Sequence, residues 1–200
     1  MITIGLTGGI GCGKSVVASL LELYGMSVYI ADEESKRLLT SSPLIRERLT
    51  TLLGSSIYDD DGLNRRLMAS LIFNDAKLLE QVNAVIHPEV AHHFKAWMSR
   101  QTTNFVVLES AILFESRLNH LVDICMLVYA PHELRIKRVM ARDKITETEV
   151  LQRMQHQIPD EEKRILSDYV IHNDDRHALV PQIEKALISI TNYELKIKKF

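Results

Sequence analysis

The sequence predicts an α/β protein built on a parallel sheet. Short apolar segments alternate with helical segments along the chain, a pattern typical of parallel strands covered by helices on both faces. The chain has 200 residues, of which 46% are hydrophobic and 25% are charged. This is the ordinary mixture of a globular protein, and we expect one domain over residues 1–200.

The expected strands are short and rich in apolar residues: Ile2–Thr7, Met26–Ile30, Phe105–Leu108, Ile124–Tyr129 and Tyr169–Ile171. A helix is expected over Lys14–Tyr24, with Gly25 as its stop. Its apolar face would carry Val16, Val17, Leu20 and Leu21. A second helix is expected over Asp32–Leu39.

Two long stretches interrupt the alternation of strands and helices. Residues Pro43 to Gln101 read as almost entirely helical, with a turn at Asp59–Gly62, and predict a helical insert beside the sheet. Residues His132 to Leu166 are also helical and rich in Arg. Pro159 and the acids that follow it indicate the start of a further helix there.

The bulk charge and the cysteines exclude several classes of protein. A net charge of -2, with His neutral, does not indicate nucleic acid or an anionic membrane as the main partner. Cys12 and Cys125 make no disulfide framework, so both are expected to be reduced. No basic leader and no apolar stretch of about 18 residues is present, which favours a cytoplasmic protein. The sequence sets no oligomeric state.

A glycine-rich loop carries the strongest functional signal. Gly8-Gly9-Ile10-Gly11-Cys12-Gly13-Lys14-Ser15 fits the pattern G-x-x-x-x-G-K-[ST] between an expected strand and an expected helix. The loop amides and the helix N-terminus would bind phosphate, Lys14 would reach the β and γ phosphates of ATP, and Ser15 would ligate Mg²⁺. The candidate nucleotide-binding residues run from Gly8 to Val16. The alternative is a glycine-rich turn that binds nothing.

Two acids follow expected strands. Glu109 ends the strand at Phe105–Leu108 and could hold the magnesium shell through water, or could be a helix-capping or solvated residue. Asp32 follows the second strand, at the edge where open α/β folds bind ligands. It could orient the acceptor hydroxyl or simply cap the next helix.

An arginine stripe follows at helical spacing. Arg135, Arg138 and Arg142 lie at i, i+3 and i+7, on one helical face. A basic helix pair that closes over ATP would stabilise charge on the moving phosphoryl group. The next helix opens with the capping-box pattern Thr146–Glu149 and would carry Arg153 and Gln157 on one face. The alternative is a solvated surface.

Other polar residues give weaker signals. Arg65 and Arg66 could bind an anionic acceptor or be merely exposed, and His87 could be a packed or capping histidine. No cluster of His and Cys has the spacing of a metal site.

Together these residues resemble the dephospho-CoA kinase family over nearly the whole chain. The loop resembles that of the family, with Cys12 where Ser is usual, and Asp32 is the second acid of the family's Asp-Ala-Asp. Further segments resemble family motifs: Asp61-Gly62 with Arg65 and Phe73, Ile86-His87-Pro88, Leu113-Phe114-Glu115, the lid-side residues Arg135, Arg138, Arg142, Arg153 and Gln157, and Asp168–Asn173. Ala111 stands where the family has Pro, and Glu109 where Asp is common.

The resemblance implies a three-layer P-loop kinase fold with a lid at about 132–166 and a helical CoA-binding insert at about 43–101. It implies transfer of phosphate from ATP, with Mg²⁺, to the ribose 3′-hydroxyl of dephospho-CoA, a small-molecule substrate. Asp32 and Lys14, with Arg138 or Arg142 over the γ-phosphate, would be the catalytic residues. Asp32, Arg65 and His87 would bind the acceptor.

Two other functions share part of the pattern. A kinase for nucleoside monophosphates or shikimate would share the loop and the lid. A regulatory GTPase would share the loop, and Asp59-Asp60-Asp61-Gly62 fits D-x-x-G, but no N-K-x-D segment is present.

Overall fold

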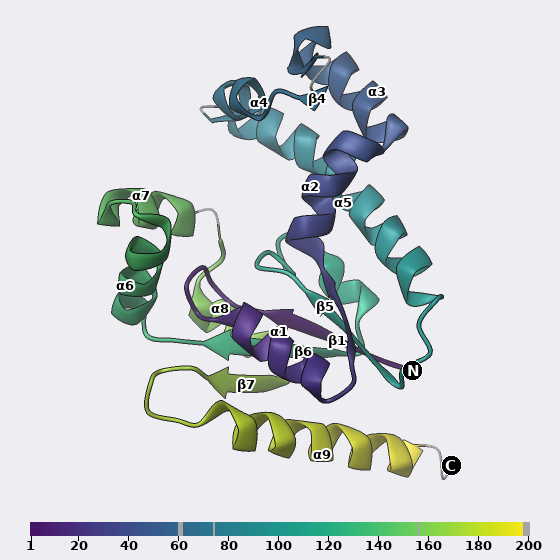
Figure 1. Cartoon of the computed structure of the whole chain (residues 1–200), viewed down its shortest axis with the longest axis vertical. Coiled ribbons are helices and arrows are strands. Elements are labelled where there is room, and N and C mark those ends of the chain that lie inside the picture. Colours follow the sequence, from purple (N-terminus) through teal and green to yellow (C-terminus); the bar gives the residue numbers. More distant parts are fainter. Residues whose placement is uncertain (60–61, 74, 156, 198–200) are drawn as a thin grey trace. The chain divides into compact units, whose positions relative to one another are not determined.

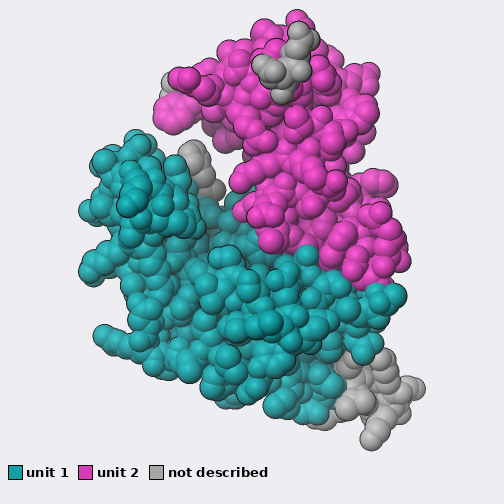
Figure 2. Space-filling model, viewed as in Figure 1, with its two compact units in different colours: residues 1–28, 102–200 teal, residues 29–101 magenta. Residues whose placement is uncertain are grey.

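The chain forms two compact units in a computed structural model that describes residues 1–59, 62–73, 75–155 and 157–197. The first, the sheet unit, comprises Met1–Val28 and Thr102–Phe200, and the second, the helical unit, comprises Tyr29–Gln101 (Figure 2). Each unit is described by itself below.

A five-stranded sheet in the order β2-β5-β1-β6-β7 carries the candidate nucleotide loop (Figure 1). Parallel pairs join β1 to β5, β1 to β6 and β6 to β7. The strands are β1 (Ile2–Thr7), β2 (Ser27–Ile30), β5 (Phe105–Glu109), β6 (Ile124–Tyr129) and β7 (Tyr169–His172). The predicted α/β fold with a parallel sheet is confirmed, and each expected strand is present within a residue or two of its predicted bounds.

Two helices pack on one face of this sheet. Buried side chains of β1 meet Val17 and Leu21 of α1 (Lys14–Leu23) and Ile183 and Ile190 of α9 (Leu179–Ile197) in one apolar cluster. Every residue of β1 is buried, including Thr3, Gly5 and Thr7 between its apolar positions, as expected for a strand that is covered on both faces. Val16 is 51% exposed and lies outside the cluster, so its assignment to the apolar face was wrong.

The Arg-rich segment folds into three helices, as its sequence predicts. They are α6 (His132–Asp143), α7 (Glu147–Met154) and α8 (Asp160–Ile165). Thr146 caps α7 through the predicted capping box with Glu149, and Pro159 precedes the first residue of α8. Between β5 and β6 lies the short helix η2 (Leu118–Leu121).

The helical unit is mostly helical, as expected, but it also contains a short antiparallel hairpin. Its elements are α2 (Ala31–Ser41), α3 (Pro43–Leu53), η1 (Ser55–Ile57), β3 (Tyr58–Asp59), β4 (Gly62–Leu63), α4 (Arg65–Ile72) and α5 (Ala76–Met98). The strands β3 and β4 flank the predicted turn, whose central residues Asp60 and Asp61 lie outside the described residues. Phe94 and the aromatic rings of Tyr29 and Trp97 pack together in this unit.

Both cysteines are buried and free, as expected from their number and setting. Burial raises the pKa of each thiol, that of Cys125 to about 11. Among the described residues, no helix combines the length and apolar character needed to cross a bilayer.

Candidate active site

The glycine loop lies between β1 and α1, as its sequence predicts. The loop turns at Gly11, with φ of 81°, and at Gly13, with φ of 89°. These left-handed conformations are costly for residues with a Cβ, which accounts for glycine at both positions. Gly13 is the N-cap residue of α1, and the first turn of that helix contains no acid that would repel an anion.

Lys14 is held beside Glu109 at the carboxyl edge of the sheet. Lys14 Nζ lies 3.6 Å from Glu109 Oε1, and both side chains are largely buried. The register of β1 against β5 pairs Leu6 with Glu109, which brings the end of β5 next to the start of the loop. Glu109 is therefore a buried partner of Lys14, and its interpretation as a solvated residue was wrong.

Arg135 is buried and lies directly against the loop. Only 5% of this residue is exposed, and its Nε donates a 2.9 Å hydrogen bond to the Ile10 carbonyl oxygen. Its guanidinium also pairs with Asp160 at the start of α8. Burial lowers the pKa of the Arg135 guanidinium. A Cβ placed on Gly9 would collide with the guanidinium, so the glycine allows this approach.

The other two arginines of the stripe lie in different surroundings. Arg138 donates to the Asn173 carbonyl oxygen at 3.0 Å and pairs with Asp175 at 2.6 Å. Arg142 has 64% of its side chain exposed and pairs with Asp143 at 2.7 Å. Asp143 also accepts from Arg153 at 2.9 Å. The stripe therefore runs from a buried arginine beside the loop to an exposed one at the end of α6.

Gln157 does not lie on a helix, because α7 ends at Met154. The expected shared helical face of Arg153 and Gln157 was therefore wrong. Gln157 instead reaches the loop, where its Oε1 accepts a 2.9 Å hydrogen bond from the Ile10 N–H. Its Nε2 lies 3.4 Å from the Ala111 carbonyl oxygen. The amide side chain thus joins the loop to the segment that follows β5.

A buried ion pair, which the sequence analysis missed, supports this arrangement. Lys163 is fully buried on α8 and its Nζ lies 3.1 Å from Glu115 Oε1. The same ammonium donates to the Ala111 carbonyl oxygen at 2.8 Å. Burial lowers the pKa of Lys163, and Glu115 opposes that change. In the sequence, Lys163 lies in a charged run typical of an exposed helix, so no local signal marks it.

The candidate acceptor residues all belong to the helical unit. Asp32 lies in the first turn of α2, whose N-cap residue is Ile30, so its alternative role as the helix cap was wrong. Its side chain is exposed, and among the described residues it makes no hydrogen bond or ion pair. Arg65, the first residue of α4, donates to the Lys36 carbonyl oxygen of α2 at 3.3 Å. His87 lies on α5, and burial lowers its pKa.

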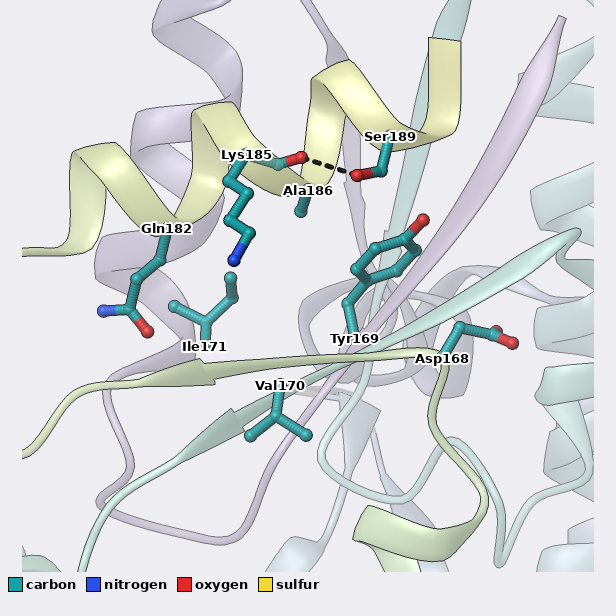
Figure 3. A pocket seen from close by; sticks show the side chains of 8 residues that line it. All are labelled: Asp168, Tyr169, Val170, Ile171, Gln182, Lys185, Ala186 and Ser189. Carbon is teal, nitrogen blue, oxygen red and sulfur yellow. Dashed lines mark hydrogen bonds between the residues drawn. The ribbon is translucent and has the colours of Figure 1, made fainter. Parts of the chain in front are cut away.

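One pocket of the sheet unit lies away from the glycine loop. A pocket of about 310 Å³ lies between β7 and α9 and has Tyr169, Gln182 and Lys185 among its lining residues. Figure 3 shows Tyr169 and Lys185 between these two elements, while Val170 points away on the other side of the strand. None of its lining residues belongs to the glycine loop. Within the described ranges, no cluster of His, Cys, Asp and Glu has the geometry of a metal site.

The chain matches one family and several known proteins over nearly its whole length. The model of the dephospho-CoA kinase family matches residues 2–178. A dephospho-CoA kinase of Bacteroides fragilis is 44% identical over 183 residues, which cover 91% of this chain and 89% of that protein. A dephospho-CoA kinase of Porphyromonas gingivalis is 42% identical over 191 residues, or 95% of each chain. The crystal structure of TT1252 from Thermus thermophilus is 36% identical, with a TM-score of 0.80 over 96% of this chain and 97% of that one.

Proposed function

This chain belongs to the dephospho-CoA kinase family, and we propose that its own residues bind ATP and dephospho-CoA and transfer the γ-phosphate to the ribose 3′-hydroxyl. The family catalyses this transfer as the last step of coenzyme A biosynthesis. The observation that carries the proposal is the glycine loop with Lys14 beside it, at the carboxyl edge of the sheet.

The loop residues from Gly8 to Val16 bind the triphosphate of ATP. The residues fit this role, because the amides of Gly11 and Gly13 donate no hydrogen bond within the described part of the chain and lie at the N-terminus of α1. Lys14 adds a positive charge, and Glu109 holds its ammonium near the loop. Ser15, exposed in the first turn of α1, would hold Mg²⁺, which neutralises charge on the phosphates when bound.

Asp32 orients the attacking hydroxyl. Its exposed carboxylate has no structural partner among the described residues, so it is available to accept a hydrogen bond from the acceptor. Arg65 and His87 bind the rest of dephospho-CoA, for which Arg65 supplies a cation next to α2. Positioning of this kind supplies most of the catalysis in phosphoryl transfer, because the reaction needs little covalent help.

Arg138 and Arg142 complete the site from α6. Arg142 is exposed and pairs with Asp143, its partner among the described residues, so it can exchange Asp143 for a phosphate oxygen at little cost. Arg138 binds the carbonyl oxygen of Asn173, whose side chain in turn binds the Cys12 carbonyl oxygen of the loop. A cation over the γ-phosphate stabilises charge that develops during transfer and excludes water.

A panel of acceptors tests this proposal. The purified chain is incubated with ATP, Mg²⁺ and one acceptor at a time, and ADP formation is measured with dephospho-CoA, shikimate, AMP and no acceptor. We expect turnover with dephospho-CoA alone. Turnover with shikimate or AMP but not with dephospho-CoA would overturn the substrate and keep the kinase.

A further inference from the structure

Two carbonyl groups of the glycine loop are held from outside by side chains. Asn173, which directly follows β7, donates from its Nδ2 to the Cys12 carbonyl oxygen at 2.8 Å. Arg135 donates from its Nε to the Ile10 carbonyl oxygen at 2.9 Å. Both donors lie more than a hundred residues from the loop in sequence. The loop's shape therefore depends on side chains outside its own motif.

Each of these contacts fixes the direction of the next amide. The described peptide bonds include no cis bond, and the C=O and N–H of a trans peptide point in opposite directions. Holding the Cys12 carbonyl toward Asn173 thus turns the Gly13 N–H away from Asn173. Holding the Ile10 carbonyl toward Arg135 turns the Gly11 N–H away from Arg135 in the same manner.

Both amides that are turned in this way are without an acceptor in the described part of the chain. Within the described ranges, the Gly11 and Gly13 N–H groups donate to no acceptor, whereas the Cys12 N–H between them bonds to the Gly9 carbonyl oxygen at 3.1 Å. The fit at Gly13 is close, since a Cβ there would collide with Asn173 Nδ2. The site thus offers donors whose direction is set before any anion binds, which is the condition for strong electrostatic stabilisation.

We infer that Asn173 and Arg135 are positioning residues of the ATP site. Each holds one loop carbonyl and thereby aims the amide of the following glycine at the phosphates. Asn173 is held in turn by its own backbone, because its N–H donates to the Tyr129 carbonyl oxygen at 2.8 Å and its carbonyl oxygen accepts from Arg138. The inference rests on the proposed function, in that the loop binds a triphosphate.

Binding of inorganic tripolyphosphate with Mg²⁺, measured by calorimetry, tests the inference without the adenosine part of ATP. Asn173→Leu has nearly the shape of Asn but no donor. We expect it to weaken tripolyphosphate binding about tenfold. The Gly13 N–H would no longer be aimed at the anion, and the loss is about that of one hydrogen bond to a charged group. The KM for ATP should rise in parallel, with the KM for dephospho-CoA unchanged.

Gln182→Leu is the matched control. The Gln182 side chain binds the backbone of His172, the residue before Asn173, through hydrogen bonds of 2.8 and 3.0 Å, and does not contact the loop. It reports what the loss of side-chain hydrogen bonds at the end of β7 does when the loop itself is not touched. We expect tripolyphosphate affinity to stay within about twofold of the wild type.

Two outcomes would contradict separate claims. If the wild type binds tripolyphosphate and Asn173→Leu binds it equally well, the inference is overturned and the proposed function stands. If the wild type does not bind it, the proposed function fails. Should Asn173→Leu not fold, as seen in thermal unfolding without ligand, Arg135→Lys serves instead, since it keeps the charge but cannot serve both Asp160 and the Ile10 carbonyl. Unchanged affinity in that variant would also overturn the inference.

Discussion

The Asp32 side chain is exposed and has no hydrogen-bond or ion-pair partner among the described residues. A carboxylate in such surroundings seldom contributes to the stability of the fold. We expect Asp32→Ala to lower kcat by about a hundredfold or more, because a positioned acceptor for the hydroxyl proton is lost. Steady-state kinetics with dephospho-CoA would measure the change, and circular dichroism would show an unchanged fold.

The neighbouring acid provides a control for this substitution. Glu33 lies in the same first turn of α2 and is also exposed. Glu33→Gln removes one negative charge from the same helix end and should leave kcat near the wild-type value. Equal losses in both variants would show that the charge of the helix end matters, rather than the carboxylate of Asp32.

At the scale of single residues, the sequence predicted the loop well and its supports poorly. The spacing of Gly8 to Ser15 is local, so the strand, the turn and the helix could be placed from it. The contacts of Asn173 and Arg135 with the loop join positions far apart in sequence, so no local pattern predicts them. Arg135 reads as one of three equivalent arginines until its burial is known.

At the scale of elements, α8 depends on a buried charge for its place in the sheet unit. Lys163 and Glu115 are paired, and Glu115 Oε2 is buried with no hydrogen-bond partner in the described part of the chain. We expect Lys163→Met to reduce the free energy of unfolding by about 3 kcal/mol, because it leaves the Glu115 carboxylate buried without a counter-charge. Urea denaturation would measure the loss.

A double variant separates the pair from the packing around it. In Lys163→Met with Glu115→Gln, residue 115 is neutral and still offers an oxygen to the Ile158 N–H. Its stability should recover part of the loss. The exposed Lys137→Met on α6 should change stability little. A double variant as unstable as Lys163→Met would contradict a buried-charge explanation.

The helix ends of the Arg-rich segment, residues 132–166, show why some predictions at this scale succeeded and others failed. The start of α7 was predictable, because Thr146 and Glu149 bond to each other's backbone within one turn. Its end at Met154 was not, because Gln157 leaves the helical spacing to bind the loop and Ala111. The hairpin of β3 and β4 is so short that only its turn was visible in the sequence.

At the scale of the whole molecule, two histidines should make stability depend on pH. Burial lowers the pKa of His87 and of His93. In the unfolded chain their pKa is about 6.5. Just below that pH the unfolded state therefore binds protons that the folded state does not bind. The free energy of unfolding should therefore fall as the pH is lowered through about 6.5. Well above that pH both histidines are neutral in both states, so they should make no contribution to its pH dependence.

Substitution of one histidine tests this dependence. His87→Leu should reduce the loss of stability between about pH 7.5 and pH 5.5, measured as urea midpoints, because one of the two groups no longer takes up a proton. The exposed His120→Asn serves as the control. A pH dependence of His87→Leu identical to that of the wild type would contradict the assignment.

The overall architecture followed from the sequence because it depends on repeated local patterns. The buried strand Ile124–Tyr129 is apolar throughout, the buried strand Ile2–Thr7 has Thr and Gly between its apolar residues, and helices separate such strands along the chain. The strand order β2-β5-β1-β6-β7 depends on pairings between distant segments and was not predicted. The division of the chain after Val28 was likewise invisible, because β2 runs through it without a break in composition.

The central claim is that this site moves a phosphoryl group from ATP to one hydroxyl of dephospho-CoA. Phosphorus NMR of the product made by the purified chain with ATP and Mg²⁺ tests it most directly. The account predicts a new phosphomonoester on the ribose 3′ oxygen, absent when Lys14→Ala replaces the wild type. A phosphate at any other position, or the same product from Lys14→Ala at an undiminished rate, would contradict it.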